Sequence, residues 1–139
     1  HEGVGLDLDD LQNARRYSGW VAYGRSKLAN ICFTYELARR LQGSTVTANC
    51  LHPGFVASRF GDNNTGLLGM LFGVAKSVAA ISEEEGAKTS IYVASSPEVA
   101  GVSGAYFDRC KPARSSAVSY DEGVARKLWD ASEKLVGVD

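Results

Sequence analysis

The longest periodic pattern in the chain lies between residues 21 and 41. Its apolar side chains recur every three or four residues, which places them on one face of a helix, and no proline interrupts the stretch. Arginines in the last turn suit the negative end of the helix dipole, and Gly43 supplies a stop. The pattern predicts a helix over residues 21–41 whose buried face holds Leu28, Ile31, Cys32, Tyr35, Ala38 and Leu41.

Two shorter stretches predict strands. Residues 45–51 are only partly polar and rich in β-formers, and Pro53 and Gly54 end them. Residues 104–107 form a second short stretch of the same kind. We therefore expect two strands, the first of which ends in a Pro-Gly turn.

Two further helices are expected. Ser82 is followed by three glutamates, which predicts an N-cap with acidic residues in the first turn. This helix should run to about residue 95, where Pro97 closes it. Residues 121–135 predict the last helix.

The remaining stretches predict connections. Residues 11–17 suggest a short helix or turn, broken by Gly19. Residues 55–81 begin rich in Gly and Asn and become more helical later, and residues 111–119 suggest a loop. We find no internal repeat, low-complexity tract or interdomain linker.

The order helix, strand, helix, strand, helix favours an α/β fold with a parallel sheet covered by helices on both faces. Two parallel strands cannot bury both faces of such a sheet by themselves. We therefore expect residues 1–139 to be the C-terminal part of a single Rossmann-like, doubly wound domain whose N-terminal strands are missing.

Composition narrows the function classes. Hydrophobic residues make up 45% of the 139 residues, which is enough for a core. The net charge is -1, so a nucleic-acid partner is not expected. Three widely spaced cysteines predict free thiols in a reducing, intracellular compartment, and the two histidines show no spacing with them that would bind zinc, so no metal is expected. No stretch reaches the roughly 20 apolar residues of a membrane span, which leaves a cytoplasmic location, or a membrane association through missing residues.

Tyr23 and Lys27 are the first residues that indicate chemistry. Helix positions i and i+4 share one face, so the two side chains can enter one cleft. A nearby ammonium favours the ionised form of a phenol, which can then exchange a proton with an alcohol or carbonyl oxygen. The alternative is an amphipathic helix that happens to carry a surface tyrosine and a surface lysine.

The Pro53-Gly54 turn is the second feature that indicates chemistry. Open α/β sheets bind ligands at the carboxyl ends of their strands, and a Pro-Gly turn there leaves backbone groups unobstructed. Such groups can bind a carboxamide. The alternative is an ordinary turn at the end of a strand.

Together these motifs resemble the short-chain dehydrogenase/reductase family. The resemblance is carried by Tyr23-Gly24-Arg25-Ser26-Lys27 and by His52-Pro53-Gly54-Phe55-Val56 at the family's spacing. The run Ser26-Lys27-Leu28-Ala29-Asn30, with His52-Pro53-Gly54, is most similar to the retinol-dehydrogenase-like branch. A weaker likeness continues through Glu84-Glu85-Gly86-Ala87, Gly104-Ala105-Tyr106-Phe107 and the last helix, so it covers nearly the whole chain.

The resemblance implies a nicotinamide-dependent oxidoreductase that transfers a hydride between NADP(H) or NAD(H) and a lipophilic aldehyde, ketone or retinol-like alcohol. Tyr23 would be the catalytic acid/base, and Lys27 would make the phenol more acidic and bind the ribose hydroxyls. Both would contact the cofactor, as would the backbone at Pro53, Gly54 and Val56. Ser58 stands where the family often has a threonine near the carboxamide or phosphate.

The same resemblance places a substrate-covering loop and helix within residues 59–81. Apolar side chains there, together with Phe55, suit an apolar substrate, although they could equally pack on the core. These candidate substrate residues are Phe55, Leu67, Leu68, Met70, Leu71 and Phe72.

What the chain does not match also bears on function. Nothing in it matches the family's glycine-rich phosphate turn or its catalytic Ser and Asn, which lie upstream in that family, so we expect the isolated 139 residues to be inactive. The branch favours NADP(H) over NAD(H), and family members often pair through the Tyr/Lys helix, which implies a homodimer. The alternatives are a truncated, non-catalytic interaction module and an epimerase or dehydratase of the extended branch.

Overall fold

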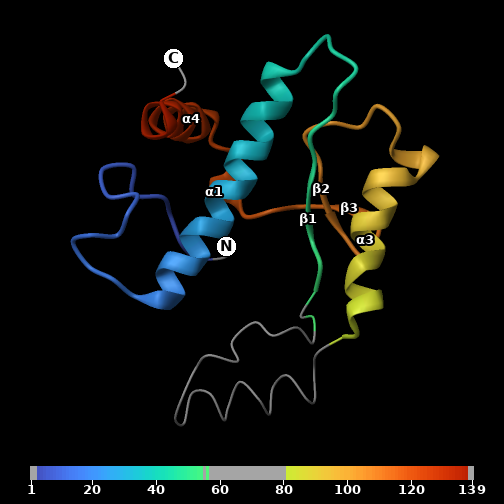
Figure 1. Ribbon diagram of the computed structural model, residues 1–139, viewed down its shortest axis with the longest axis horizontal. Helices are drawn as coiled ribbons and strands as arrows, with labels where there is room; N and C mark the ends of the chain where they lie inside the picture. The colour runs from blue at the N-terminus through green and yellow to red at the C-terminus, as the bar shows by residue number, and fades with distance from the viewer. Residues whose placement is uncertain (1–2, 55, 57–80, 138–139) are drawn as a thin grey trace. The chain divides into compact units, whose positions relative to one another are not determined.

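The computed structural model describes residues 3–54, 56 and 81–137 (Figure 1). Helices and short strands alternate, and three strands form one sheet in the order β1-β2-β3, so the α/β class is confirmed. The elements in chain order are α1 (Gly19–Arg40), β1 (Cys50–His52), α3 (Glu83–Ser95), β2 (Tyr106–Asp108), β3 (Lys111–Ala113) and α4 (Glu122–Val136), with 3-10 turns at Pro97–Val99 and Ala117–Tyr120.

Contacts between residues divide the chain into two compact units. The first comprises His1–Cys50, Gly101–Tyr106 and Ala113–Asp139 and therefore contains α1 and α4. The second comprises Leu51–Ala100 and Phe107–Pro112 and contains α3.

The predicted long helix is α1, but it begins at Gly19, whereas the expected start was residue 21. Before α1 the chain forms turns, because the Asp10 carboxylate accepts hydrogen bonds from the backbone N–H groups of Ala14 and Arg15 at 2.7 and 3.0 Å. Asn13 adopts a φ of 53°, which no helix allows. Residues 11–17 are therefore a turn region, and the glycine that was expected to break a helix starts one instead.

The core of the first unit lies between α1 and α4. Leu28 and Cys32 from α1 pack with Ala125 and Leu128 from α4 in one buried cluster. The side chains that the pattern assigned to the buried face are buried, except that Leu41 lies at the C-cap and is only half-buried. The apolar residues packed against this cluster are Val4, Leu6, Leu8, Leu11 and Ala29.

The last helix, α4, agrees with its prediction within one residue at each end. Its N-cap is Asp121, whose carboxylate accepts a 3.0 Å hydrogen bond from the N–H of Val124. Gly137 ends it in the left-handed conformation at a φ of 69°, which glycine adopts without steric cost.

The two predicted strands are shorter than expected and displaced toward their C-terminal ends. Gly104 has a φ of +74°, outside the strand region, so β2 starts only at Tyr106. Ahead of β1, the Asn49 side chain donates to the Val102 carbonyl at 2.7 Å and accepts from the Ala105 N–H at 3.0 Å. A side chain thus replaces part of the backbone ladder, and regular pairing is confined to Cys50–His52.

In the second unit, the N-cap of α3 is the predicted one: the Ser82 hydroxyl accepts from the Glu85 N–H at 3.2 Å. The strand β3 was not expected, because residues 111–119 suggested a loop. Arg109 and Cys110 have φ values of 49° and 59°, which two-residue hairpin turns require, so the chain reverses and adds an antiparallel strand. Arg-Cys lacks the Asn-Gly signature of such turns, and for this reason the sequence did not reveal it.

Within the described residues, no helix is both long and apolar enough to cross a membrane.

Candidate functional site

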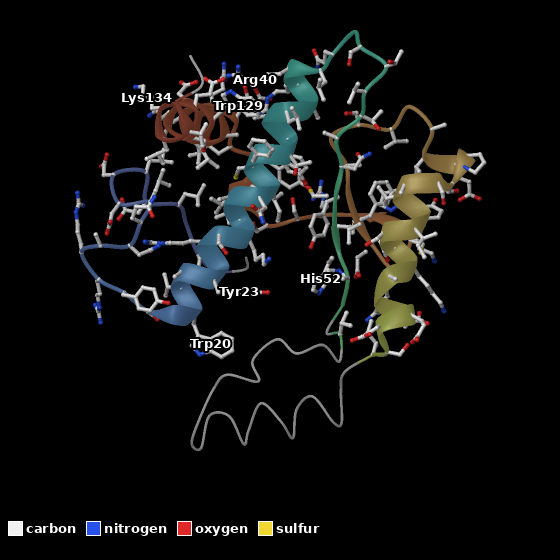
Figure 2. All side chains as sticks on the ribbon, in the orientation of Figure 1. Trp20, Tyr23, Arg40, His52, Trp129 and Lys134 are labelled. Carbon is white, nitrogen blue, oxygen red and sulfur yellow. The ribbon has the colours of Figure 1, made fainter. Side chains whose placement is uncertain are left out.

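Tyr23 and Lys27 lie together on α1. The Lys27 Nζ is 5.3 Å from the centroid of the Tyr23 ring, so the i, i+4 spacing brings the phenol and the ammonium to the same face of the helix. Lys27 is exposed, and 43% of the surface of Tyr23 is accessible. Figure 2 shows Tyr23 projecting outward from α1. The pair can therefore reach a bound molecule without any rearrangement of the core.

The buried stripe next to this pair explains its exposure. Gly24 follows Tyr23 directly and Leu28 follows Lys27, and both are buried. A Cβ on Gly24 would lie 3.3 Å from the Val4 methyl carbons. The absence of a side chain at Gly24 lets the N-terminal segment approach this face closely. The neighbouring face, which carries Tyr23 and Lys27, is left accessible.

Two hydrogen bonds fix the helix around the pair. The Ser26 hydroxyl donates to the Tyr23 carbonyl at 2.8 Å, and the Arg25 guanidinium donates to the Asn13 side chain at 2.7 Å. A hollow in the first unit lies next to Arg25, and neither Tyr23 nor Lys27 lines it. Its lining residues are Leu6, Asp7, Asp10, Leu11, Asn13, Ala22, Arg25, Ser26 and Ala29.

The predicted Pro-Gly turn is present in the second unit. β1 ends at His52, and Gly54 follows with a φ of +83°, a conformation that side-chain-bearing residues rarely adopt. Pro53 is exposed and Gly54 is half-buried, so backbone groups of this turn are open to contact. The structure thus gives a physical reason for the glycine that the sequence singled out.

Val56 lies just beyond the turn and pairs with Ile81 in an isolated parallel bridge. Its side chain packs against Gly86 in the first turn of α3. The sequence noted Gly86 only as part of a weak resemblance. A glycine inside a helical pattern usually has a packing reason, and this signal could have drawn attention to it.

Trp20 is a second residue that the sequence did not single out. It lies three residues before Tyr23 on α1, is 66% exposed, and projects from the same end of the helix as Tyr23 in Figure 2. Positions i and i+3 are neighbours on a helix surface. An indole surface therefore lies close to the phenol.

The cysteines with a shifted pKa do not form a nucleophilic site. Burial raises the pKa of the Cys50 thiol to about 11, and burial likewise raises the pKa of Cys32. Both are therefore thiols at neutral pH, whereas a nucleophilic cysteine reacts as the thiolate.

The other candidate residues cannot be placed. The predicted contacts at Phe55, Ser58, Leu67, Leu68, Met70, Leu71 and Phe72 lie outside the described residues. Tyr23 and Lys27 belong to the first unit, and Pro53, Gly54 and Val56 to the second. The roles assigned to both groups stay predictions.

Comparison with known proteins identifies relatives along the whole chain. It is 50% identical to retinol dehydrogenase 14 of Homo sapiens over 96% of its length, and 43% identical to human retinol dehydrogenase 13 over 100%. Human polyprenol dehydrogenase is 37% identical over 99% of the chain. The chain spans only 40%, 44% and 42% of these three relatives, respectively.

A solved structure shares the fold. The crystal structure of an uncharacterised protein from Mycobacterium paratuberculosis matches 95% of the chain and 45% of that protein, with a TM-score of 0.68 and 32% sequence identity. No protein-family model matches the chain.

Proposed function

The chain belongs to the retinol-dehydrogenase-like branch of the short-chain dehydrogenase/reductase family, and we propose that the protein carrying it transfers a hydride between NADP(H) or NAD(H) and a carbonyl or alcohol. One observation carries this proposal: the exposed Tyr23 phenol and the Lys27 ammonium lie on one face of α1.

The residues present suit a nicotinamide cofactor. Lys27 offers three N–H donors, enough to bind ribose hydroxyls, and a phenol both donates and accepts hydrogen bonds. The turn at Pro53 and Gly54 offers backbone groups, and Gly54 itself carries no side chain that would cover them. When bound, the nicotinamide carries the hydride.

The work of the chain itself is to hold the substrate oxygen and move its proton. In the direction of reduction, the Tyr23 hydroxyl donates its proton to the carbonyl oxygen, and in oxidation the phenolate takes the proton from the alcohol. Lys27 orients the ribose beside the phenol, and the backbone at Pro53, Gly54 and Val56 orients the carboxamide. In this proposal the cofactor is NADP(H) rather than NAD(H), as the branch favours.

The substrate in this proposal is a lipophilic alcohol or its aldehyde. The names of the relatives indicate retinol and polyprenol as substrates of those proteins, and both molecules are long, apolar and end in a primary alcohol. The indole of Trp20 beside Tyr23 supports this choice, because it gives an apolar chain a surface near the reacting oxygen.

The expected partners and compartment also stay proposals. A homodimer through α1 is supported by Phe33, which keeps 41% of its surface exposed on that helix. The proposal of a reducing compartment rests on the number and wide spacing of the cysteines in the sequence, Cys32, Cys50 and Cys110.

Replacing Tyr23 with Phe tests the proposal, because it removes only the hydroxyl. In the full-length protein we expect kcat for NADPH-dependent reduction of retinaldehyde to fall by at least about 10²-fold, the typical contribution of a general acid. The melting temperature should not change, since the ring is exposed. Steady-state kinetics and thermal denaturation measure the two effects.

Tyr17→Phe is the matched control, because this tyrosine is 76% exposed and lies just before the same helix. It should retain wild-type kinetics. Undiminished turnover in Tyr23→Phe, in a wild-type protein that does reduce the aldehyde, would refute the role assigned to Tyr23.

A further inference from the structure

The backbone that would contact the nicotinamide is tied to the start of α3 within the second unit. Val56 and Ile81, 25 positions apart in the sequence, pair in a parallel bridge. Ser82 follows immediately and is the N-cap of α3. The segment after the Pro-Gly turn therefore has the first turn of α3 as its direct neighbour.

Two hydrogen bonds close the first turn of α3. The Ser82 hydroxyl accepts from the Glu85 N–H at 3.2 Å, and the Ser82 carbonyl accepts from the Gly86 N–H at 3.0 Å. Gly86 lies five residues after Ile81 of the bridge, and its N–H group takes part in one of these two hydrogen bonds. Its position relative to Val56 is determined by backbone geometry.

Gly86 leaves no room for a side chain. A Cβ at this position would lie 2.5 Å from Val56 Cγ2 and 3.3 Å from Cγ1, but 3.5 Å from Val56 Cβ, which is an ordinary contact. The obstruction thus comes from the two methyl groups of Val56. Relief of the overlap requires a less favourable χ1 rotamer of Val56, which is stiff because valine is β-branched, or a shift of the Val56 backbone or of the helix.

The turn on the other side of Val56 meets the same element. A Cβ on Gly54 would lie 2.8 Å from Ile81 Cδ1, and Gly54 has a φ of +83°. Ile81 therefore touches the segment twice, through its bridge to Val56 and through its side chain over Gly54. Both contacts come from the residue that leads into α3.

We propose that Gly86 is a positioning residue for cofactor binding: by giving Val56 a flat backbone surface to pack on, it sets where the backbone at Gly54 and Val56 presents itself to the nicotinamide. Ile81 acts with it through the bridge. This inference rests on the proposed function, since the cofactor contact of this segment is part of that proposal.

Helix propensity and packing predict opposite effects of Gly86→Ala. Alanine is the better helix former by roughly 1 kcal/mol, so a glycine with no special role would yield a more stable protein with unchanged cofactor affinity. If the glycine positions Val56, alanine instead displaces the segment and weakens binding. Unchanged affinity for the cofactor would indicate a glycine with no special role, and weakened affinity would indicate a positioning role.

The experiment is a double-mutant cycle in the full-length protein, with the dissociation constant for NADPH measured by fluorescence titration. We expect Gly86→Ala to raise this constant about tenfold, as overpacking of a tight contact does. Val56→Ala removes both methyl groups and is the reference with which the double variant is compared. The double variant Val56→Ala/Gly86→Ala should return to within about threefold of Val56→Ala, because the overlap is gone.

Ser90→Ala is the control on the same helix, since Ser90 is exposed, and it should bind NADPH as the wild type does. Activity gives a second readout: KM for NADPH should rise in Gly86→Ala, while kcat at saturating cofactor stays near the wild-type value. If Gly86→Ala does not fold, the comparison of the double variant with Val56→Ala remains decisive.

Each outcome is informative. Weakened binding in Gly86→Ala that the second substitution restores supports the positioning role. Wild-type affinity in Gly86→Ala, or a double variant that binds weakly or fails to fold, overturns it while the proposed function stands. A wild-type protein that binds neither NADPH nor NADH overturns the proposed function, and the inference falls with it.

Discussion

The two halves of α1 differ in what they expose. The first half, up to Lys27, presents Trp20, Tyr23 and Lys27 to the surroundings. The second half holds most of the buried positions of the helix, which are Leu28, Ile31, Cys32, Tyr35, Glu36 and Ala38. A continuous helix transmits position along its length through its own hydrogen bonds. The buried half can therefore hold the exposed half in place, so that reactive side chains stay accessible without becoming mobile.

The buried half is held by polar contacts as well as by apolar packing. Glu36 is buried and accepts hydrogen bonds from the guanidinium groups of Arg39 and Arg40 at 3.0 and 2.8 Å. The Arg40 guanidinium also lies 4.5 Å from the ring of Trp129 on α4, and Trp129 stacks on Phe33 at 4.9 Å. The contacts of Trp129 attach the C-terminal half of α1 to α4, and Figure 2 labels Arg40 and Trp129.

A second polar cluster surrounds Tyr35, which lies in the same C-terminal half of α1. The Tyr35 hydroxyl and the Ser115 hydroxyl are 2.7 Å apart, and Ser115 is 2.7 Å from the Ser119 hydroxyl. Burial raises the pKa of Tyr35, so its phenol stays neutral, in a structural position. One helix thus carries two tyrosines, of which the exposed one suits proton transfer and the buried one suits packing.

Among the substitutions that test the difference between the two halves of α1, Leu28→Ala should give the largest loss of stability. Leu28 is fully buried in the α1–α4 cluster, so its truncation leaves a cavity, and we expect the free energy of unfolding to fall by about 2–5 kcal/mol. Urea denaturation measures it. Val21→Ala, at an exposed site of the first half, is the control and should change stability by less than about 0.5 kcal/mol. Equal losses in both variants would mean that the two halves do not differ as described.

Glu36→Gln should give a smaller loss, of about 1–3 kcal/mol, because it leaves two guanidinium groups without their carboxylate. Burial opposes the charge on Glu36, but the hydrogen bonds from Arg39 and Arg40 outweigh it and lower the pKa of this carboxyl below its usual 4.5. A lowered pKa stabilises the folded state above pH 4.5, and that stability is lost as the pH falls through the folded-state value.

The variant should therefore lack part of the acid dependence of the wild type, which denaturation at several pH values between 3 and 7 measures. Glu83→Gln, at an exposed carboxylate of α3, is the control and should keep that dependence. An unchanged pH profile in Glu36→Gln would show that the pair of arginines does not stabilise the end of α1.

The smallest expected effect is on the stability of the folded state at alkaline pH. Burial raises the pKa of Cys50 from 9.0 to about 11, with a hydrogen bond from Thr34 acting in the opposite direction. Its contribution to stability is complete below pH 9 and is lost as the pH rises through about 11, because the unfolded chain ionises first. Cys50→Ala should flatten this part of the stability profile. An identical slope between pH 9 and 11 in variant and wild type would show that the half-buried Cys50 thiol does not have a raised pKa.

The helical part of the fold could be predicted because its signals are local. The 3.6-residue period of α1, the Ser82 cap with its acidic first turn, and the Pro53-Gly54 end of β1 each depend on a few consecutive residues. The pairing of Tyr23 with Lys27 follows from the same period. For these features the sequence alone was sufficient, since neighbours along a helix are neighbours in space.

Tertiary structure decided the features that depend on distant residues. The Asn49 side chain shortens β1 by bonding to Val102 and Ala105, and the hairpin at Arg109 and Cys110 adds β3 without a turn signature. The need for a glycine at position 86 comes from its contact with Val56, thirty positions away. The sequence by itself determined which side chains share a helix face; the fold decided which segments touch, because contacts across long loops depend on packing of the whole chain rather than on local periodicity.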